Sequence, residues 1–86
     1  AARSVFQLPY VILREGITDV VLLSEEEILE GVRLALFTTH NMAEAAGAVS
    51  LSAACKIKNR LAGKKVVMIM SGGNLSLHTL KLAIGC

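Results

Sequence analysis

Two short, uninterrupted apolar runs most constrain the fold of this chain. Residues 19–23 read Asp-Val-Val-Leu-Leu, and residues 65–70 read Lys-Val-Val-Met-Ile-Met. Neither run alternates polar with apolar side chains, which is the pattern of strands buried on both faces in a parallel sheet. Helical patterns separate the two runs, and this alternation is typical of α/β folds. We therefore expect an α/β fold with a parallel sheet.

The first forty residues predict two helices. Residues 4–15 carry an apolar stripe at helical spacing, and Pro9 is expected to kink or delay this helix. A second helix is expected to begin after Ser24, which forms a capping box with Glu27, and to run to about Thr39. Four of its side chains are expected to face inward: Ile28, Val32, Ala35 and Leu36.

The second half of the chain predicts two further helices around the second apolar run. Residues 42–61 contain mostly Ala, Gly and Ser at first and become basic after Cys55, and residues 75–84 form another amphipathic pattern. The predicted order of elements is therefore α-β-α-α-β-α. Two parallel strands do not make a stable sheet, so the remaining strands must come from another part of a larger domain.

The composition agrees with a segment whose apolar surface is covered by other protein. Hydrophobic residues make up 53% of the 86 residues, and charged residues make up 19%. An average soluble domain has about 25% charged residues, and a small one should have more, because its surface-to-volume ratio is high. We expect residues 1–86 to be a single segment of a larger catalytic or binding domain.

Several classes of function are disfavoured. The net charge is only +2 and aromatic residues are 3%, so a nucleic-acid interface is not expected. No stretch of about 18 residues is both uncharged and strongly apolar, so no membrane span is expected. Cys55 and Cys86 match no metal-ligand spacing. We expect free thiols, no metal site, and a reducing, cytoplasmic location.

The loop Ser71-Gly72-Gly73-Asn74 follows the second apolar run and precedes a helical pattern. In open α/β folds, ligands bind where parallel strands end. Glycines let a flat ligand approach the backbone, and amides at a helix start can hold an anion. The same sequence also fits a tight turn packed against a neighbouring strand, and the pattern leaves both interpretations open.

Glu44 is the other candidate site residue. It is the only charged residue between Arg33 and Lys56, and it lies among small side chains. A carboxylate in such surroundings suits proton transfer. The alternative is structural, because Asn41 and Glu44 have the spacing of a capping box. The two roles are compatible.

Three segments resemble the C-terminal part of the catalytic domain of threonine/serine dehydratases, a family that depends on pyridoxal 5′-phosphate (PLP), has the tryptophan-synthase-β fold type and includes serine racemases. They are ARSVFQLPYVILREGITDVVLLSEEEI, THNMAEAAGAVSLSA and LAGKKVVMIMSGGNLSLHTL. This chain has Glu44-Ala45-Ala46-Gly47 where the family often has Glu-Gly-Ala-Gly. The resemblance covers essentially the whole chain.

The resemblance implies a three-layer parallel-sheet PLP fold and the conversion of L-threonine or L-serine to a 2-oxo acid and ammonia. It implies that Ser71 hydrogen-bonds the pyridine nitrogen of PLP, that Gly72 and Gly73 line the ring edge, and that Asn74 braces the loop. Glu44 would lie on the cofactor side. A small amino-acid substrate, a homo-oligomer and the remainder of the same catalytic domain are the implied partners.

The family's lysine that binds PLP covalently is expected upstream of this segment. Five lysines lie in polar or terminal contexts that do not favour such a nucleophile: Lys56, Lys58, Lys64, Lys65 and Lys81. The chain alone is therefore expected to be inactive. Serine racemase is an alternative within the family, and a non-catalytic α/β binding or assembly module is an alternative outside it.

Overall fold

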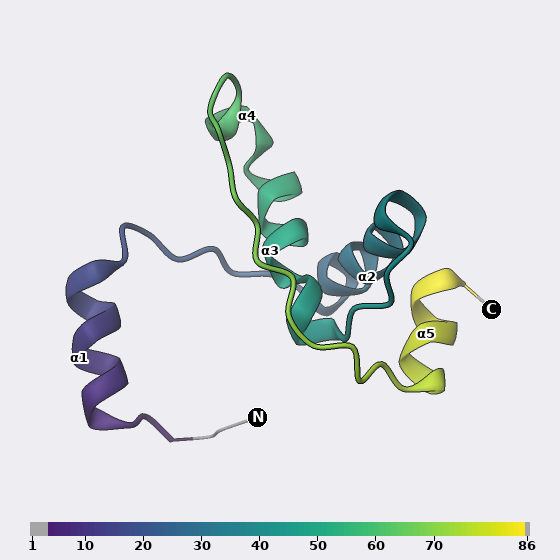
Figure 1. Ribbon diagram of the computed structural model, residues 1–86, viewed down its shortest axis with the longest axis horizontal. Coiled ribbons are helices and arrows are strands. Elements are labelled where there is room, and N and C mark those ends of the chain that lie inside the picture. Colours follow the sequence, from purple (N-terminus) through teal and green to yellow (C-terminus); the bar gives the residue numbers. More distant parts are fainter. Residues whose placement is uncertain (1–3, 86) are drawn as a thin grey trace.

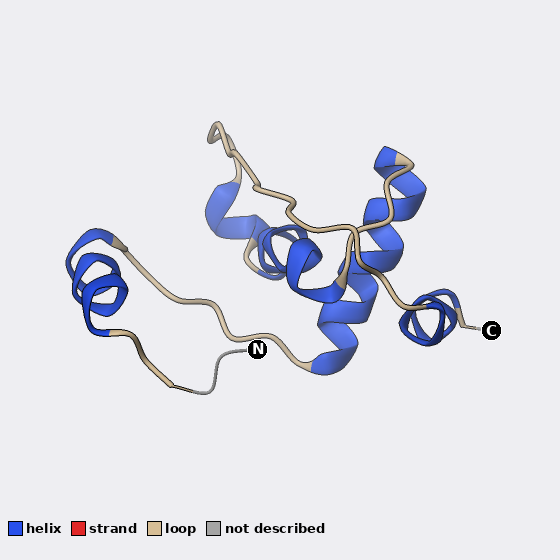
Figure 2. Ribbon diagram, turned by 60° about the horizontal axis from the view of Figure 1, so that its bottom comes forward, coloured by secondary structure: helices blue, strands red, loops and turns tan. Residues whose placement is uncertain are grey.

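The computed structural model describes residues 4–85, which form five helices joined by extended segments (Figure 1). The helices are α1 (Gln7–Gly16), α2 (Glu25–Thr39), α3 (Ala45–Lys56), α4 (Lys58–Leu61) and α5 (Leu77–Ile84). Helix α2 packs against both α3 and α5. Helix α1 contributes no buried residue and stands apart from the other helices (Figures 1 and 2).

The predicted α/β fold is wrong, because residues 4–85 contain helices and no strand (Figure 2). The two apolar runs are present as extended segments, but each uses a backbone carbonyl to bind α3. The Lys56 ammonium donates to the Leu22 carbonyl at 2.7 Å, and the Ser50 hydroxyl donates to the Ile69 carbonyl at 2.6 Å. A strand requires a partner strand for its hydrogen bonds, and residues 4–85 bring no two extended segments into such a ladder.

The predicted start and end of α2 are confirmed. The Ser24 hydroxyl accepts from the Glu27 amide at 3.1 Å, and the Glu27 carboxylate accepts from the Ser24 amide at 2.8 Å. These two bonds satisfy backbone donors that a helix start leaves free. The helix ends at Thr39, and His40 follows it in the left-handed conformation, with φ of 58°.

The core lies where α2, α3 and α5 meet, and it is small. Its buried apolar residues are Val32, Ala35, Ala43, Ala48 and Ala83. Of the predicted inward-facing residues of α2, Val32 and Ala35 are buried, whereas Ile28 and Leu36 are half-buried. A Cβ added to Gly31 would overlap the Ser52 hydroxyl, so the missing side chain lets α2 and α3 approach closely.

The other helices begin later than the sequence predicts. Helix α1 begins at Gln7, so Pro9 falls in the first turn, where its missing N–H costs no hydrogen bond. Helix α5 begins at Leu77, because the Ser76 hydroxyl accepts from the Thr79 amide at 3.1 Å and caps the helix. The single helix predicted over residues 42–61 is instead two helices, because α3 begins at Ala45 and ends at Lys56, and α4 follows from Lys58 to Leu61.

Candidate functional site

The loop of residues 71–74 lies at the first turn of α3. After a turn at Gly63, the chain extends back beside α3 (Figure 1), and the Ser50–Ile69 hydrogen bond ties it to the helix. The amide of Glu44 then donates to the carbonyl oxygen of Gly72 at 3.2 Å. The structure therefore brings Glu44 beside the loop, although the two are far apart in sequence.

Gly47 allows this loop to approach the helix closely. An ideal Cβ on Gly47 would overlap the carbonyl oxygen of Ser71 and would lie 2.7 Å from its carbonyl carbon. It would also lie 3.0 Å from the carbonyl oxygen of Gly72. Real Cβ atoms essentially never come closer than 3.0 Å, so the loop can occupy this position only because residue 47 has no side chain.

Gly72 makes room for the Glu44 side chain. It adopts a φ of 76°, and a Cβ there would overlap a Glu44 carboxylate oxygen and lie 2.6 Å from the carboxyl carbon. A Cβ on Gly73 would meet only the Met42 carbonyl oxygen, at 3.5 Å. The Glu44 carboxylate thus lies against Gly72, whereas a Cβ on Gly73 would make an ordinary van der Waals contact.

The capping role considered for Glu44 is not observed. Asn41 instead donates from its side-chain amide to the Thr39 carbonyl oxygen at 2.9 Å. Glu44 is itself the residue that precedes α3, and its side chain makes no capping hydrogen bond. The half-buried carboxylate is therefore not used to start the helix.

The four predicted loop residues offer a hydroxyl, two glycines and a side-chain amide. Ser71, Gly72, Gly73 and Asn74 are all exposed in residues 4–85. A hydroxyl can donate to a ring nitrogen, and two glycines leave the ring edge unobstructed. The chemistry of these groups is compatible with a flat heteroaromatic ring, and the Glu44 carboxylate lies against Gly72 of the same loop.

Two ion pairs lie near the C-terminal end of α3, one between α3 and α2 and one between α4 and the segment of residues 19–23. Lys56 binds Glu27 at 3.0 Å, and Arg60 binds Asp19 at 2.9 Å. Hydrogen bonds from the Ser24 amide and from Lys56 hold the pKa of Glu27 below its ordinary value. Hydrogen bonds from Arg60 and from the Val20 amide similarly lower the pKa of Asp19. These contacts fix α3, on whose first turn the loop rests.

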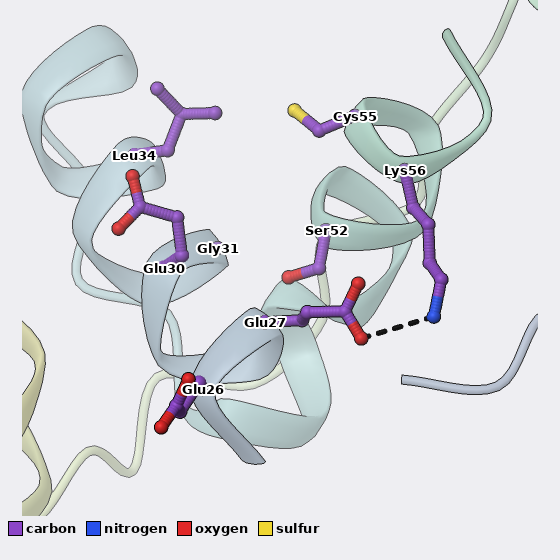
Figure 3. A pocket seen from close by; sticks show the side chains of 8 residues that line it. All are labelled: Glu26, Glu27, Glu30, Gly31, Leu34, Ser52, Cys55 and Lys56. Carbon is purple, nitrogen blue, oxygen red and sulfur yellow. Dashed lines mark hydrogen bonds and ion pairs between the residues drawn. The ribbon is translucent and has the colours of Figure 1, made fainter. Parts of the chain in front are cut away.

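A groove of about 360 Å³ lies between α2 and α3 (Figure 3). It is lined by Glu26, Glu27, Glu30, Gly31, Leu34, Ser52, Cys55 and Lys56. Its buried hydroxyl, that of Ser52, already donates to the Ala48 carbonyl at 3.3 Å, and its thiol, that of Cys55, is free and exposed. None of the predicted site residues lines this groove. The other cysteine, Cys86, lies outside the described residues.

Residues 4–85 contain neither a cluster of metal-ligating side chains nor a membrane-spanning helix. No group of three His, Cys, Asp or Glu side chains is arranged to hold a metal ion in this part of the chain. None of its helices is both long enough and apolar enough to cross a bilayer. All five lysines are exposed, and Lys56 is engaged by Glu27 and Leu22.

Some residues that position the site were not identified from the sequence. Ser50 carries no signal beyond its place in a small-residue helix, because its partner is a carbonyl far along the chain. Lys56 and Arg60 resemble the ordinary basic end of a helix. Gly47 did carry a signal, because it is the last residue of the Glu44–Gly47 motif.

Comparison with curated proteins finds similar sequences. The chain is 33% identical to an L-threonine ammonia-lyase of Geobacter sulfurreducens over 87% of its own length and 19% of that protein. It is 34% identical to a catabolic L-threonine dehydratase of Escherichia coli strain K12 over 91% of its length and 24% of that protein. It is 28% identical to a serine racemase of Schizosaccharomyces pombe over 80% of its length and 21% of that protein.

The chain spans about a fifth of the length of these relatives. No family model matches it, and no solved structure matches it. The similar proteins nevertheless carry the names of one group of enzymes, the group that the residues themselves suggest. The predicted resemblance is therefore confirmed: this chain is similar in sequence to threonine dehydratases and to serine racemase.

Proposed function

We propose that this chain is the C-terminal part of the catalytic domain of a PLP-dependent ammonia-lyase, which converts L-threonine or L-serine to a 2-oxo acid and ammonia. One observation carries the proposal: the loop of residues 71–74 rests on the first turn of α3, with the Glu44 carboxylate against Gly72. The similarity to L-threonine ammonia-lyases supports the reaction class.

PLP, when bound, supplies the electron sink that allows the substrate to lose its α-proton and then its β-hydroxyl. The role of this chain is to bind and orient the ring. Ser71 offers a neutral hydroxyl to the pyridine nitrogen, so the protein places no full charge opposite that atom. Gly72 and Gly73 would leave the ring edge free, and the resemblance assigns to Asn74 the role of bracing the loop.

Glu44 would act from the cofactor side of the site. Its carboxylate is half-buried, lies against Gly72 and makes no helix-capping bond. A carboxylate held in this way can accept a hydrogen bond or hold a proton at its oxygen atoms. We assign it to proton handling beside the ring.

The remainder of the catalytic domain would supply the lysine that binds PLP and would cover the apolar side chains exposed here. Val67 is 91% exposed and Leu22 is 80% exposed in residues 4–85. Burying a side chain of this size contributes about 1.5–3 kcal/mol. We therefore propose that residues 1–86 act only within a larger, cytoplasmic and oligomeric enzyme.

The test uses the full-length protein that contains this segment. It is treated with borohydride, digested and analysed by mass spectrometry, and its products from L-threonine and L-serine are measured. The proposal expects a PLP adduct on a lysine outside these 86 residues and formation of 2-oxo acid with ammonia. An adduct on one of the five lysines of this chain, or no adduct at all, would contradict it.

Two other results would identify the alternatives. The similarity to serine racemase makes D-serine formation the second activity to measure. Formation of D-serine without 2-oxo acid would assign the protein to racemisation. A protein that neither binds PLP nor transforms either amino acid would be the non-catalytic binding module instead.

A further inference from the structure

We propose that Gly47 is a positioning residue, whose missing side chain determines how deeply the loop of residues 71–74 rests against α3. Its effect on catalysis depends on the proposed function, because it acts by placing the Ser71 hydroxyl. The contact itself does not depend on that function.

A side chain at residue 47 would meet backbone atoms of the loop first. The three atoms nearest to a Cβ at this position all belong to the backbone of Ser71 and Gly72. A backbone carbonyl cannot rotate away as a side chain can. Gly31 differs, because the atom nearest to its added Cβ is the hydroxyl at the end of the Ser52 side chain.

The helix itself does not require glycine at residue 47. Among residues 4–85, the glycines with positive φ are Gly63, Gly72 and Gly85, so Gly47 has a backbone conformation open to any residue. In a helix, alanine is more favourable than glycine by about 0.8–1.0 kcal/mol. Glycine at residue 47 therefore makes α3 less stable than alanine would. The close contact with the loop is the feature that requires the glycine.

The consequence of a side chain at residue 47 is a displaced loop. The Ser71 carbonyl would have to move away from α3, and the hydrogen bond from the Glu44 amide to the Gly72 carbonyl would be broken or lengthened. Ser71 and the Glu44 carboxylate would then no longer keep their relative positions. A misplacement of about 1 Å in an active site can cost on the order of 100-fold in rate.

The experiment compares Gly47→Ala with Ser71→Ala and with the double variant in the full-length protein. The matched control is Ala46→Gly, which alters helix propensity at the neighbouring position, where the side chain is exposed rather than buried as Gly47 is. Three quantities are measured: kcat/KM, the absorption maximum of the bound cofactor, and the hydrogen-exchange rate of the Glu44 amide.

The proposal expects Gly47→Ala to lower kcat/KM on the order of 100-fold, to shift the absorption maximum and to raise the Glu44 exchange rate at least about tenfold. The double variant should lose little more than the more damaging of the two single variants, because both changes disturb the placement of the Ser71 hydroxyl. Ala46→Gly should leave the absorption maximum and the Glu44 exchange rate unchanged.

The proposal would be overturned if the Glu44 amide exchanged in Gly47→Ala at the same rate as in the wild type. It would also be overturned if the loss of kcat/KM in the double variant equalled the product of the losses in the two single variants. If the wild-type protein binds no PLP, the proposed function fails, and the exchange rate alone decides the role of Gly47. If Gly47→Ala does not fold, a nuclear Overhauser contact between the Gly47 Hα and Ser71 backbone protons is sought in the wild type. Its absence would overturn the close contact.

Discussion

The amide of Glu44 donates a hydrogen bond of 3.2 Å to the carbonyl oxygen of Gly72. This bond joins the start of α3 to the loop of residues 71–74, and the Glu44 carboxylate lies against the same glycine. The two candidate sites identified in the sequence, the loop and Glu44, are therefore in contact.

The Ser71 hydroxyl is expected to be needed for activity and not for attachment of the cofactor. In the full-length protein, Ser71→Ala should lower kcat by at least about tenfold, because a lost hydrogen bond to a developing charge is worth about 1.5–3 kcal/mol. The PLP content should stay the same. Ser71→Thr, which keeps a hydroxyl, should retain more activity than Ser71→Ala. Equal kinetics for the wild type and Ser71→Ala would remove Ser71 from the site.

The Ser50 hydroxyl is expected to hold the extended segment on α3. Ser50→Ala removes the 2.6 Å bond to the Ile69 carbonyl and should lower the free energy of unfolding by about 0.5–1.5 kcal/mol. Urea denaturation measures this difference. Thr38→Ala is the control, because Thr38 bonds the carbonyl of Leu34 within its own helix. A loss no larger for Ser50→Ala than for Thr38→Ala would mean that the long-range bond is unimportant.

The ion pair between Lys56 and Glu27 gives a pH dependence with a defined sign. Hydrogen bonds from the Ser24 amide and from Lys56 lower the pKa of Glu27 in the folded state. The ionised Glu27 side chain therefore contributes fully to the free energy of unfolding above the unfolded-state pKa of about 4.3. This contribution is lost as the pH falls through the lower, folded-state pKa.

Substitution of Lys56 tests this assignment. Lys56→Met should raise the pKa of Glu27 towards its ordinary value, measured by a pH titration of the carboxyl carbon resonance. Lys58→Met is the control, because it removes the same charge two residues away. If both variants shift the pKa of Glu27 equally, a general charge effect and not the ion pair is responsible.

The exposed apolar run is expected to be buried in the complete protein. Val67 is 91% exposed in residues 4–85. If Val67 were equally exposed in the full-length protein, Val67→Ala would leave the free energy of unfolding unchanged. In the full-length protein this substitution should lower the free energy of unfolding by about 2 kcal/mol, because buried methyl groups are lost. Lys65→Ala should change it by less than about 0.5 kcal/mol. Similar small effects of the two changes would argue that the run remains in solvent.

Local signals were sufficient to predict α2. Ser24 and Glu27 are three residues apart, so their capping box depends on no distant contact, and the apolar spacing that follows selects Val32 and Ala35 for the core. The two apolar runs could not be assigned in the same way. A strand depends on partners, and in residues 4–85 the partners of Leu22 and Ile69 are side chains of α3.

The candidate site could be predicted only in part. Ser71 and the two glycines that follow it were recognised from their order along the chain, and Glu44 from its isolation among small residues. Glu44 and Gly72 are in contact although they are far apart in the sequence. A local sequence pattern does not encode a contact of this kind. The predicted capping box of Asn41 and Glu44 was wrong, because the Asn41 side-chain amide donates to the carbonyl oxygen of Thr39.

The most direct test of the central claim is the nitrogen-15 resonance of PLP labelled at its pyridine nitrogen and bound to the full-length protein. The account predicts the resonance of an unprotonated nitrogen that accepts a hydrogen bond, and a clear change of that resonance in Ser71→Ala. An identical resonance in the wild type and in Ser71→Ala would contradict the claim that Ser71 faces the cofactor ring, and so would a full-length protein that retains no PLP.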